Sequence, residues 1–441
     1  MKTLAEQMAE YVAGLRFEEM PAPVVHEVKR RVIDSIGCAL GAWEAEPCVI
    51  ARRVASRFSA KRGATLLGTT HLAPADWAAF ANGCLVRYLD FNDTYLSKEP
   101  AHPSDNDFIV AIALAYEVQC RLCDTASLRA RGWDHVTYGA FSTALAAARL
   151  MRLDVERTRH AVGIAGVASA ALRQSRVGEL SHWKGCAFAN AARHGVFAAL
   201  LAREGMTGPA PIFEGEKGFQ ALVSGPLDAR VGDWGKDRDG KFMILNTSIK
   251  FWPAEYHSQS AIEAALKLRP QVGDTARIES VLVESHDAAV DIIGNELEKW
   301  RPTSRETADH SLPYIVAAAL ADGEVTAKQF GPARIADPPL LALLQRVKVE
   351  RHAELSARYP KAVGNIVTVR LRDGRTLSER VDYPRGHAQN PLNDAEVEAK
   401  FLALADARLG RERADAVLRL LWRLDEARDW DQLMSLLKMS D

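Results

Sequence analysis

The chain has 441 residues, more than one ordinary hydrophobic core holds, so its length predicts two or three domains. Hydrophobic residues make up 48% and charged residues 26%, which is the balance of a globular protein. The formal net charge of -1 excludes the broad basic field that general nucleic-acid or membrane-surface binding needs. Any anion-binding site must therefore come from a local cluster of Lys, Arg and His.

The N-terminal stretch carries Glu6, Glu10, Glu18 and Glu19 and has no uninterrupted apolar core, so it does not resemble a signal peptide. No stretch of the sequence reaches the roughly 18 apolar residues that a membrane span requires. These features predict a cytoplasmic protein without nucleic-acid or membrane partners.

The six cysteines are scattered along the chain, and only Cys120 and Cys123 form a C-x-x-C motif. Their segment has a helical pattern and no second pair follows at zinc spacing, so a buried structural pair is favoured over a metal site. An iron–sulfur cluster needs three or four cysteines at cluster spacing. We therefore expect neither a metal nor a cofactor.

Up to about Trp252 the patterns are helical. Apolar residues recur at three- and four-residue spacing from Val24 to Leu40. A run of small residues from His160 to Leu172 favours close helix packing, and a further helix is predicted from Phe188 to Gly205.

The pattern changes near Ala261. A strand is predicted from Ala276 to Ser285 and a shorter one in LLQRVKVERH, and Ile366 to Tyr383 reads as a hairpin around Asp373-Gly374. From about Asn393 the chain is helical again. The prediction is a mainly α protein: a large all-helical domain formed by both chain ends, 1–255 and 392–441, with a smaller α+β domain inserted at 256–391.

Two polar segments precede predicted helices. The first, YLDFNDTYLSKEPAHPSDND, contains Asp90 and His102, and a His near several carboxylates suits proton transfer near neutral pH. The alternative is a solvated loop in which Ser104 or Asp105 caps the next helix. The second places His135 at a helix start, where anions are favoured. A buried or capping His is the alternative there.

A third segment, RQSRVGELSHWKG, gathers Arg173, Arg176, His182 and Lys184. These groups suit the binding of carboxylates. A surface charge cluster explains them equally well.

The fourth segment, IKFWPAEYHSQSAIEAAL, contains Lys250 and Glu255. Lys250 precedes two aromatic residues, and partial desolvation there would strengthen its attraction for an anion. The segment also falls where the helical pattern gives way to the α+β pattern, and ligand clefts often form at domain boundaries.

At these segments the sequence closely resembles the MmgE/PrpD family, which includes 2-methylcitrate dehydratases, cis-aconitate decarboxylases and an iminodisuccinate epimerase. The resemblance runs over nearly the whole chain. Six motifs in family order carry it: YLDFNDTY, HPSDN, DHVTYG, SHWKG with NAARHG, KFWPAEYHSQ and ADHSLPY.

The resemblance implies a homodimer in which each chain has a helical domain and a smaller α+β lid, with the active site between them. Its site residues here are Asp90, Thr94, His102, His135, Lys184, Lys250 and Tyr314. We add Arg173, Arg176 and Glu255 as substrate-binding candidates.

The motifs most resemble the 2-methylcitrate dehydratase branch, which acts in propionate catabolism. The decarboxylase branch has His in place of Glu255. We therefore expect a hydro-lyase that dehydrates 2-methylcitrate or citrate, a small tricarboxylate, without metal. The alternatives are an epimerase or isomerase of a small acid such as iminodisuccinate and, third, a non-catalytic acid-binding protein.

Such a dehydration requires a positioned base and cations that stabilise the enolate-like intermediate. Lys184 and Lys250 suit the electrostatic role, and His102 and His135 are candidates for base and acid in either order. A further set has supporting roles: Tyr314 as hydrogen-bond donor to substrate or leaving hydroxyl, Asp90 as the group that orients a His or Lys, and Thr94 as a carboxylate ligand.

Overall fold

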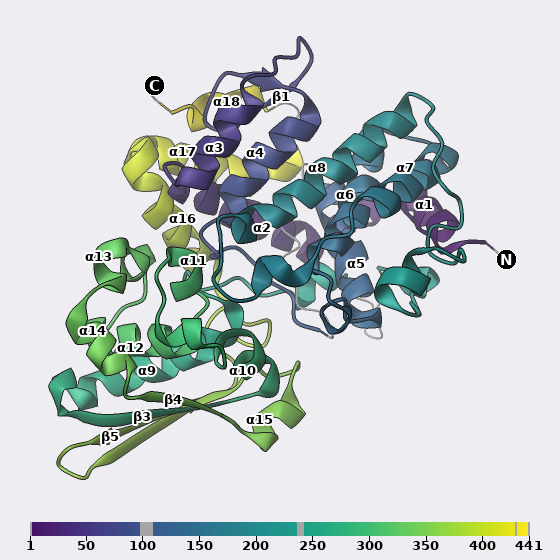
Figure 1. Cartoon of the computed structure of the whole chain (residues 1–441). Helices are drawn as coiled ribbons and strands as arrows, with labels where there is room; N and C mark the ends of the chain where they lie inside the picture. Colours follow the sequence, from purple (N-terminus) through teal and green to yellow (C-terminus); the bar gives the residue numbers. More distant parts are fainter. Residues whose placement is uncertain (1, 98–108, 236–241, 428–429, 440–441) are drawn as a thin grey trace.

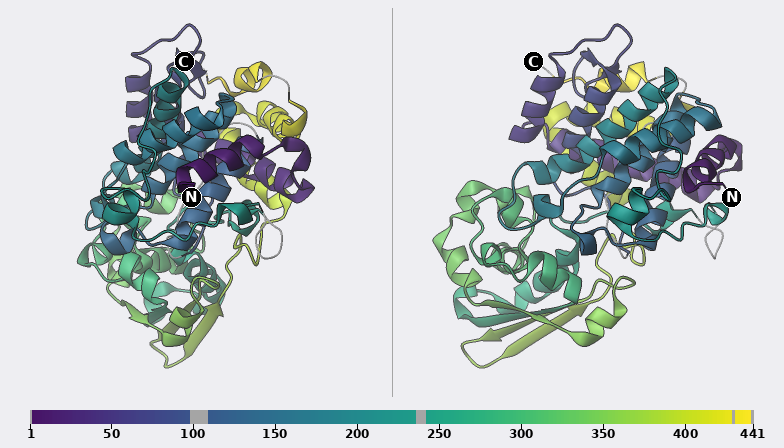
Figure 2. Two further views of the ribbon diagram at one scale, coloured as in Figure 1. Left: turned by 90° about the vertical axis from the view of Figure 1, so that its right-hand side faces the viewer. Right: turned by 45° about the vertical axis from the view of Figure 1, so that its right-hand side comes forward.

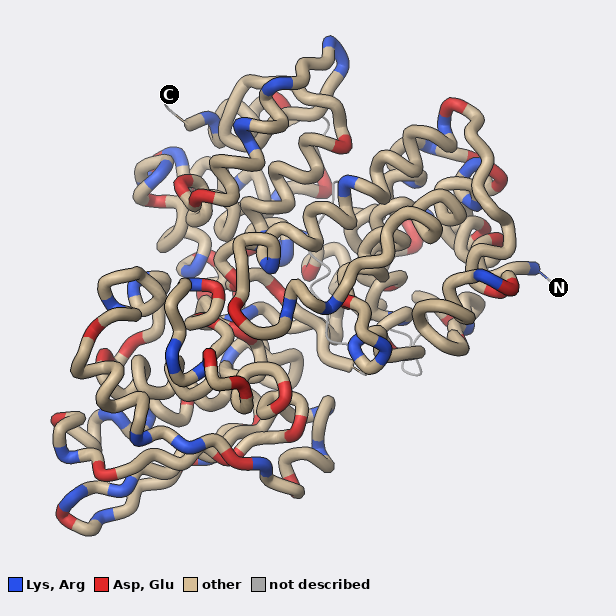
Figure 3. The backbone as a smooth tube through the Cα atoms, in the orientation of Figure 1, with Lys and Arg blue, Asp and Glu red and all other residues tan. Residues whose placement is uncertain are grey.

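The structure is a computed structural model that describes residues 2–97, 109–235, 242–427 and 430–439. It is mainly α-helical, which confirms the predicted fold class. Figures 1 and 2 show the main sheet at one end of the molecule and the larger body of helices at the other. Acidic and basic residues are interspersed over both parts (Figure 3). Within the described residues, no helix has both the length and the apolar character needed to cross a membrane.

We call the described residues of 2–250 and 394–439 the helical region. Its first helices are α1 (Leu4–Gly14), α2 (Ala22–Gly41), α3 (Glu46–Ala55), α4 (Ala75–Arg87), α5 (Ile109–Thr125), α6 (Val136–Leu150), α7 (Val155–Ala168) and α8 (Trp183–Arg203). Two short strands, β1 (Ala64–Thr65) and β2 (Leu72–Ala73), pair between α3 and α4. Cys120 and Cys123 are buried in α5, as expected.

Small residues allow the central helices to approach closely. A Cβ added to Gly195 of α8 would lie 2.8 Å from the carbonyl oxygen of Ala140 in α6. Such a distance is sterically forbidden, so only glycine permits this helix crossing. α8 also packs on α4, and Gly185, next to Lys184 at the start of α8, lies against Tyr88 at the end of α4.

The described residues of 252–381 form the sheet region. Its strands are β3 (Ile278–Ser285), β4 (Val347–Arg351), β5 (Asn365–Leu371) and β6 (Thr376–Val381), in the order β4-β3-β5-β6. β3 pairs parallel to β4 and antiparallel to β5. The predicted hairpin is confirmed, because β5 and β6 are antiparallel and Gly374 adopts a φ of 85° in their turn.

The helices of the sheet region are α9 (Gln259–Val272), α10 (Asp287–Ile293), α11 (Arg305–Ala308), α12 (Leu312–Asp322), α13 (Pro332–Ile335), α14 (Pro338–Leu344) and α15 (Ala353–Arg358). In Figures 1 and 2, α9 and α12 lie on the side of the sheet that faces the helical region. The inward side chains of β3 and β5, Val281 with Val369 and Val283 with Val367, are buried in the core beneath these helices.

The last helices, α16 (Asp394–Leu409), α17 (Arg411–Trp422) and α18 (Asp431–Leu437), return to the helical region. α16 packs on α2, where Gly37 would place a Cβ 3.3 Å from the Cα of Phe401. Phe401 and Val397 share one hydrophobic core with Ile33 and Leu85. Residues from both chain ends therefore bury their apolar faces together, separately from the core of the sheet region.

Short turns of helix connect these elements. The 3-10 turns are Phe17–Glu19, Arg129–Arg131, Arg173–Arg176, Val231–Asp233, Met243–Asn246, Tyr256–Ser258, Thr275–Arg277, Leu297–Trp300, Ala327–Phe330 and Leu424–Glu426, and Gln220–Ser224 is a π turn.

Candidate active site

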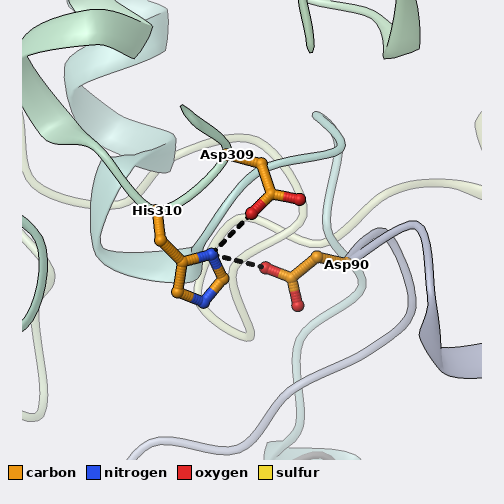
Figure 4. Close-up of side chains that lie close together, drawn as sticks. All are labelled: Asp90, Asp309 and His310. Atoms are coloured by element: carbon orange, nitrogen blue, oxygen red, sulfur yellow. Dashed lines mark hydrogen bonds and ion pairs between the residues drawn. The ribbon is translucent and has the colours of Figure 1, made fainter. Parts of the chain in front are cut away.

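A cluster of buried charged side chains lies where the two regions meet. The helical region provides Asp90, three residues beyond α4, and Lys184, in the first turn of α8. Lys250 comes from the segment that leads into the sheet region, and Asp309 with His310 comes from the loop between α11 and α12. Figure 4 shows His310 and Asp309 pointing toward Asp90 from the opposite side.

Asp90 is at the centre of this cluster. Lys250 Nζ lies 3.1 Å from Asp90 Oδ2 and also donates to the Asp90 carbonyl oxygen at 3.0 Å. Arg87 donates to Asp90 Oδ1 at 2.7 Å, and Lys184 Nζ lies 3.8 Å from Oδ2. Burial disfavours the charged carboxylate, but Lys184, Lys250 and Arg87 outweigh it and hold the pKa of Asp90 well below its usual value.

The backbone at Asp90 is left-handed, with φ of 51°. Aspartate is one of the few residues other than glycine that adopts this conformation readily. The sharp turn directly after α4 brings both the carboxylate and the carbonyl of Asp90 to Lys250.

Asp309 and His310 form a neighbouring pair. His310 Nδ1 lies 2.7 Å from Asp309 Oδ1, which in turn lies 3.2 Å from Lys184 Nζ. Burial, followed by the nearby Lys184, lowers the pKa of His310, so the ring is neutral at neutral pH. Since a carboxylate only accepts hydrogen bonds, we assign the ring proton to Nδ1 and the lone pair to Nε2. This arrangement suits a general base.

The charge of the cluster favours an anion. Among the described residues, Arg87, Lys184 and Lys250 face two carboxylates, those of Asp90 and Asp309. Burial lowers the pKa of Lys250 to about 8, and Asp90 opposes this effect, so Lys250 is mostly charged at neutral pH.

Three residues of the cluster lie close enough together to be considered as ligands of a cation. One ligand atom from each of Asp90, Asp309 and His310 lies within 4.8 Å of the others. However, the ammonium groups of Lys184 and Lys250 already contact both carboxylates, and a divalent ion would have to displace or neutralise them. The donor set therefore does not fit a divalent cation.

A second Asp–His pair lies on the loop before α6. His135 Nδ1 is 2.9 Å from Asp134 Oδ1, and Asp134 Oδ2 accepts from Arg176 Nε at 2.9 Å and from Ser175 Oγ at 2.8 Å. Despite burial, Arg176 and His135 hold the pKa of Asp134 well below its usual value. His135 precedes α6 but makes no side-chain capping bond, so its ring serves the pair with Asp134 rather than the helix end.

Four further predicted site residues are Thr94, Glu255, Arg173 and His102. Thr94 is buried, and its backbone pairs with Ser248, which ties the loop after Asp90 to the segment before Lys250. Glu255 lies at the edge of the cluster, and burial raises its pKa against the effect of His310 and Lys250. Arg173 is half-buried and lies in the 3-10 turn Arg173–Arg176. His102 lies outside the described residues.

The prediction for Tyr314 needs correction. Its side chain is fully buried in the core of the sheet region, and its hydroxyl donates to the carbonyl oxygen of Gln329 at 2.6 Å. This bond uses the only phenolic proton. The structure therefore does not bring Tyr314 into the cluster, and we leave it out of the candidate site.

Sequence reasoning missed several residues of the cluster. Asp309 and His310 stand in the ADHSLPY motif, and an adjacent Asp and His before a helix was a usable signal. Arg87 is three residues from Asp90 in sequence, but it reads as an ordinary last-turn arginine.

Lys400 was also missed, and nothing in its local sequence marks it. This α16 residue donates to the carbonyl oxygens of Phe91 at 2.6 Å and Lys250 at 2.9 Å. Its ammonium group also lies 2.6 Å from Asp34 Oδ1. One buried cation thus holds together the two segments that carry Asp90 and Lys250.

Comparison with known proteins agrees with this architecture. The sequence matches the MmgE/PrpD N-terminal domain over residues 6–106 and 104–231 and the MmgE/PrpD C-terminal domain over residues 252–425. The chain belongs to the MmgE/PrpD family. The matched C-terminal domain begins at the first residue of the sheet region and extends through α16 and α17, which pack in the helical region.

Individual relatives are similar over most of their length. A 2-methylcitrate dehydratase of Cupriavidus necator is 29% identical, covering 84% of this chain and 83% of the relative. A 2-methylcitrate dehydratase of Salmonella typhimurium is 30% identical over 81% of each. A cis-aconitate decarboxylase of Homo sapiens is 26% identical, covering 99% of this chain and 95% of the relative. Dehydratases and decarboxylases are both lyases, and this protein is an enzyme of lyase type.

Proposed function

We propose that this protein is a metal-independent hydro-lyase that removes water from 2-methylcitrate or citrate, giving 2-methyl-cis-aconitate or cis-aconitate. The observation that carries the proposal is the buried cluster in which Lys184 contacts the Asp309–His310 pair and Lys250 contacts the neighbouring Asp90. The cluster combines positive charge that can bind an anionic substrate with a neutral histidine that can accept a proton.

The reaction requires both features. The carbon-bound proton next to a carboxylate is weakly acidic, and its loss builds negative charge on that carboxylate. Lys184 and Lys250 stabilise this charge in a buried site, where electrostatic interactions are stronger than in water. His310 removes the proton through Nε2 while Asp309 stabilises the imidazolium. A positioned base of this kind contributes about 100- to 10,000-fold to the rate.

His135, supported by Asp134 and Arg176, is a second histidine that could transfer a proton. Two Asp–His pairs are what an epimerase would use, with one pair on each face of the reacting carbon. Epimerisation of a small acid such as iminodisuccinate is therefore the second candidate function. His102 remains a further candidate from the sequence motif HPSDN.

The packing also supports the predicted organisation. We propose a helical domain from 1–255 and 392–441 and an α+β lid from 256–391, since each has its own hydrophobic core. A homodimer and a cytoplasmic location are further proposals that rest on the sequence.

The proposed function is tested by a substrate screen followed by NMR. Purified protein is incubated with citrate, each 2-methylcitrate stereoisomer, cis-aconitate and iminodisuccinate, and Lys184→Ala protein serves as the control preparation. Formation of 2-methyl-cis-aconitate or cis-aconitate by wild type but not by the control supports the proposal. Turnover of iminodisuccinate alone favours the epimerase. Release of carbon dioxide from cis-aconitate would show that the enzyme is a decarboxylase and not a dehydratase.

A further inference from the structure

A chain of buried polar groups leads away from the cluster into the sheet region. His257 and His286 are both inaccessible to solvent, and His257 Nδ1 lies 3.0 Å from His286 Nε2. Tyr359 stacks on His286 with ring centroids 4.8 Å apart. At the far end, His286 Nδ1 lies 3.5 Å from the carbonyl oxygen of Gly364. At the near end, His257 Nε2 lies 3.8 Å from Glu255 Oε1.

The direction of the hydrogen bonds fixes where the protons are. Both rings are neutral, because burial lowers the pKa of His257 and of His286 to about 3 in each case, and each ring therefore carries one proton. The Gly364 carbonyl only accepts, so the proton of His286 is on Nδ1 and its Nε2 accepts from His257 Nδ1. His257 Nε2 is then left with a lone pair. It has no hydrogen-bond partner among the described residues and faces Glu255.

An ionised Glu255 would be unfavourable in this arrangement. Glu255 Oε2 accepts from the backbone N–H of His257 at 2.7 Å. Glu255 Oε1 instead faces the lone pair of His257 Nε2, and two lone pairs repel each other. A proton on Oε1 removes this repulsion. At 3.8 Å the distance is too long for a firm hydrogen bond, so His257 would not retain the proton.

We propose that the His286–His257 chain keeps Glu255 as a neutral carboxylic acid, and that Glu255 supplies the proton that the leaving hydroxyl of the substrate needs. Near Glu255, Lys250 favours the ionised carboxylate and Asp90 disfavours it, while the His310 ring is neutral until it takes the substrate proton. Arg129 acts on His257, where it disfavours protonation of the ring. Burial raises the pKa of Glu255, which agrees with the arrangement.

This role rests on the proposed function and completes its proton balance. His310 takes the carbon-bound proton, the electron pair of that C–H bond forms the new double bond, and the C–O bond breaks. The leaving oxygen takes the proton of Glu255 and departs as water. Glu255 is then a carboxylate and His310 an imidazolium, and transfer of one proton from His310 to Glu255 restores both.

A purely structural role for Glu255 is the competing explanation, because its side chain also caps the 3-10 turn Tyr256–Ser258. Glu255→Gln separates the two, since glutamine keeps an oxygen acceptor for the turn but has no acidic proton. Glu354→Gln is the matched control. Glu354 is an exposed residue of the sheet region, and its hydrogen bond to Arg380 lowers its pKa, so it is ionised at neutral pH.

The first measurement requires no substrate. Infrared difference spectra of wild type minus Glu255→Gln at neutral pH should show the carbonyl band of a protonated carboxylic acid, and the band should shift in heavy water. The spectrum of wild type minus Glu354→Gln should lack it. If the first difference spectrum shows a carboxylate band instead, Glu255 is ionised and the inference is overturned, whatever the enzyme catalyses.

The second measurement compares 2-methylcitrate with its analogue in which fluorine replaces the hydroxyl. Fluoride leaves without needing a proton, so Glu255→Gln should lower turnover of 2-methylcitrate by about 100-fold or more and affect the fluoro analogue by only a few-fold. Equal losses on both substrates would make Glu255 structural and overturn the inference. If wild type eliminates neither water from 2-methylcitrate nor fluoride from its analogue, the proposed function fails, while the infrared result still decides the protonation of Glu255.

Discussion

Replacing Lys400 by Met should destabilise the protein and also slow the enzyme. The Lys400 ammonium contacts Asp34 Oδ1 at 2.6 Å and donates to the carbonyl oxygens of Phe91 and Lys250. Removing one partner of a buried ion pair costs about 3–5 kcal/mol, because the other charge is left uncompensated. Phe91 and Lys250 also lose their shared donor, and a misplacement of about 1 Å in a catalytic group can cost on the order of 100-fold in rate.

The cost of this substitution should depend on pH. Burial raises the pKa of Asp34, and Lys400 opposes that rise. The folded protein therefore binds a proton at Asp34 more readily than the unfolded chain, and stability falls as pH rises above the unfolded pKa. Without Lys400 the folded pKa rises further, so the destabilisation should be smaller at pH 5 than at pH 8.

Urea unfolding at both pH values measures the free energy, and turnover is assayed at a temperature where the variant is folded. Lys267→Met is the control, since Lys267 is half-exposed and its ion pairs with Glu263 and Glu379 lie at the surface. Such pairs contribute about 0–1 kcal/mol. If Lys400→Met loses no more stability than Lys267→Met, or loses stability but keeps wild-type turnover when folded, Lys400 does not hold the two segments in place.

Four further outcomes are expected. Lys184→Ala and Lys250→Ala should each lower turnover on the order of 100- to 1000-fold in folded protein, and near-normal rates in both would remove them from the mechanism. Because the pKa of Lys250 is about 8, its charge is lost as pH rises through that value, so turnover should fall on the alkaline side, and Lys250→Arg should shift that fall to higher pH. His310→Asn should abolish exchange of the substrate's carbon-bound proton with deuterated solvent; exchange lost only in His135→Asn would instead assign the base to His135. Chelation should leave turnover unchanged, and a loss restored by iron would contradict the metal-free proposal.

The sequence was sufficient to predict the fold because the fold depends on local patterns. The hairpin between β5 and β6 followed from alternation around Asp373-Gly374, and Gly374 has the positive φ that this turn requires. Helix α8 was predicted from Phe188, but it begins at Trp183. The five residues by which it extends include Lys184, whose charged neighbourhood hid the helical pattern.

The candidate site was only partly predictable, because its pairings join residues far apart in the chain. Lys184 and Lys250 could be proposed from motifs, but their partner Asp90 lies 160 residues before Lys250. Lys400 has no local signal, because an α16 lysine reads as a solvated helix residue until the packing of α16 on α2 is known. Tyr314 shows the opposite error, since a motif residue proved to satisfy a backbone carbonyl in the core.

The acids of the cluster explain how Lys250 remains mostly charged in a buried site. An isolated ammonium group taken out of water loses several kcal/mol of solvation, and its pKa falls until it deprotonates. Burial does lower the pKa of Lys250, and Asp90 limits that fall, while Asp309 lies 3.2 Å from Lys184. Asp90 and Asp309 repel an anionic substrate, yet without them the charge that attracts it would be reduced. Arg87, Lys184 and Lys250 still outnumber these two carboxylates. The cluster can therefore stabilise negative charge that develops on a substrate without first taking up protons.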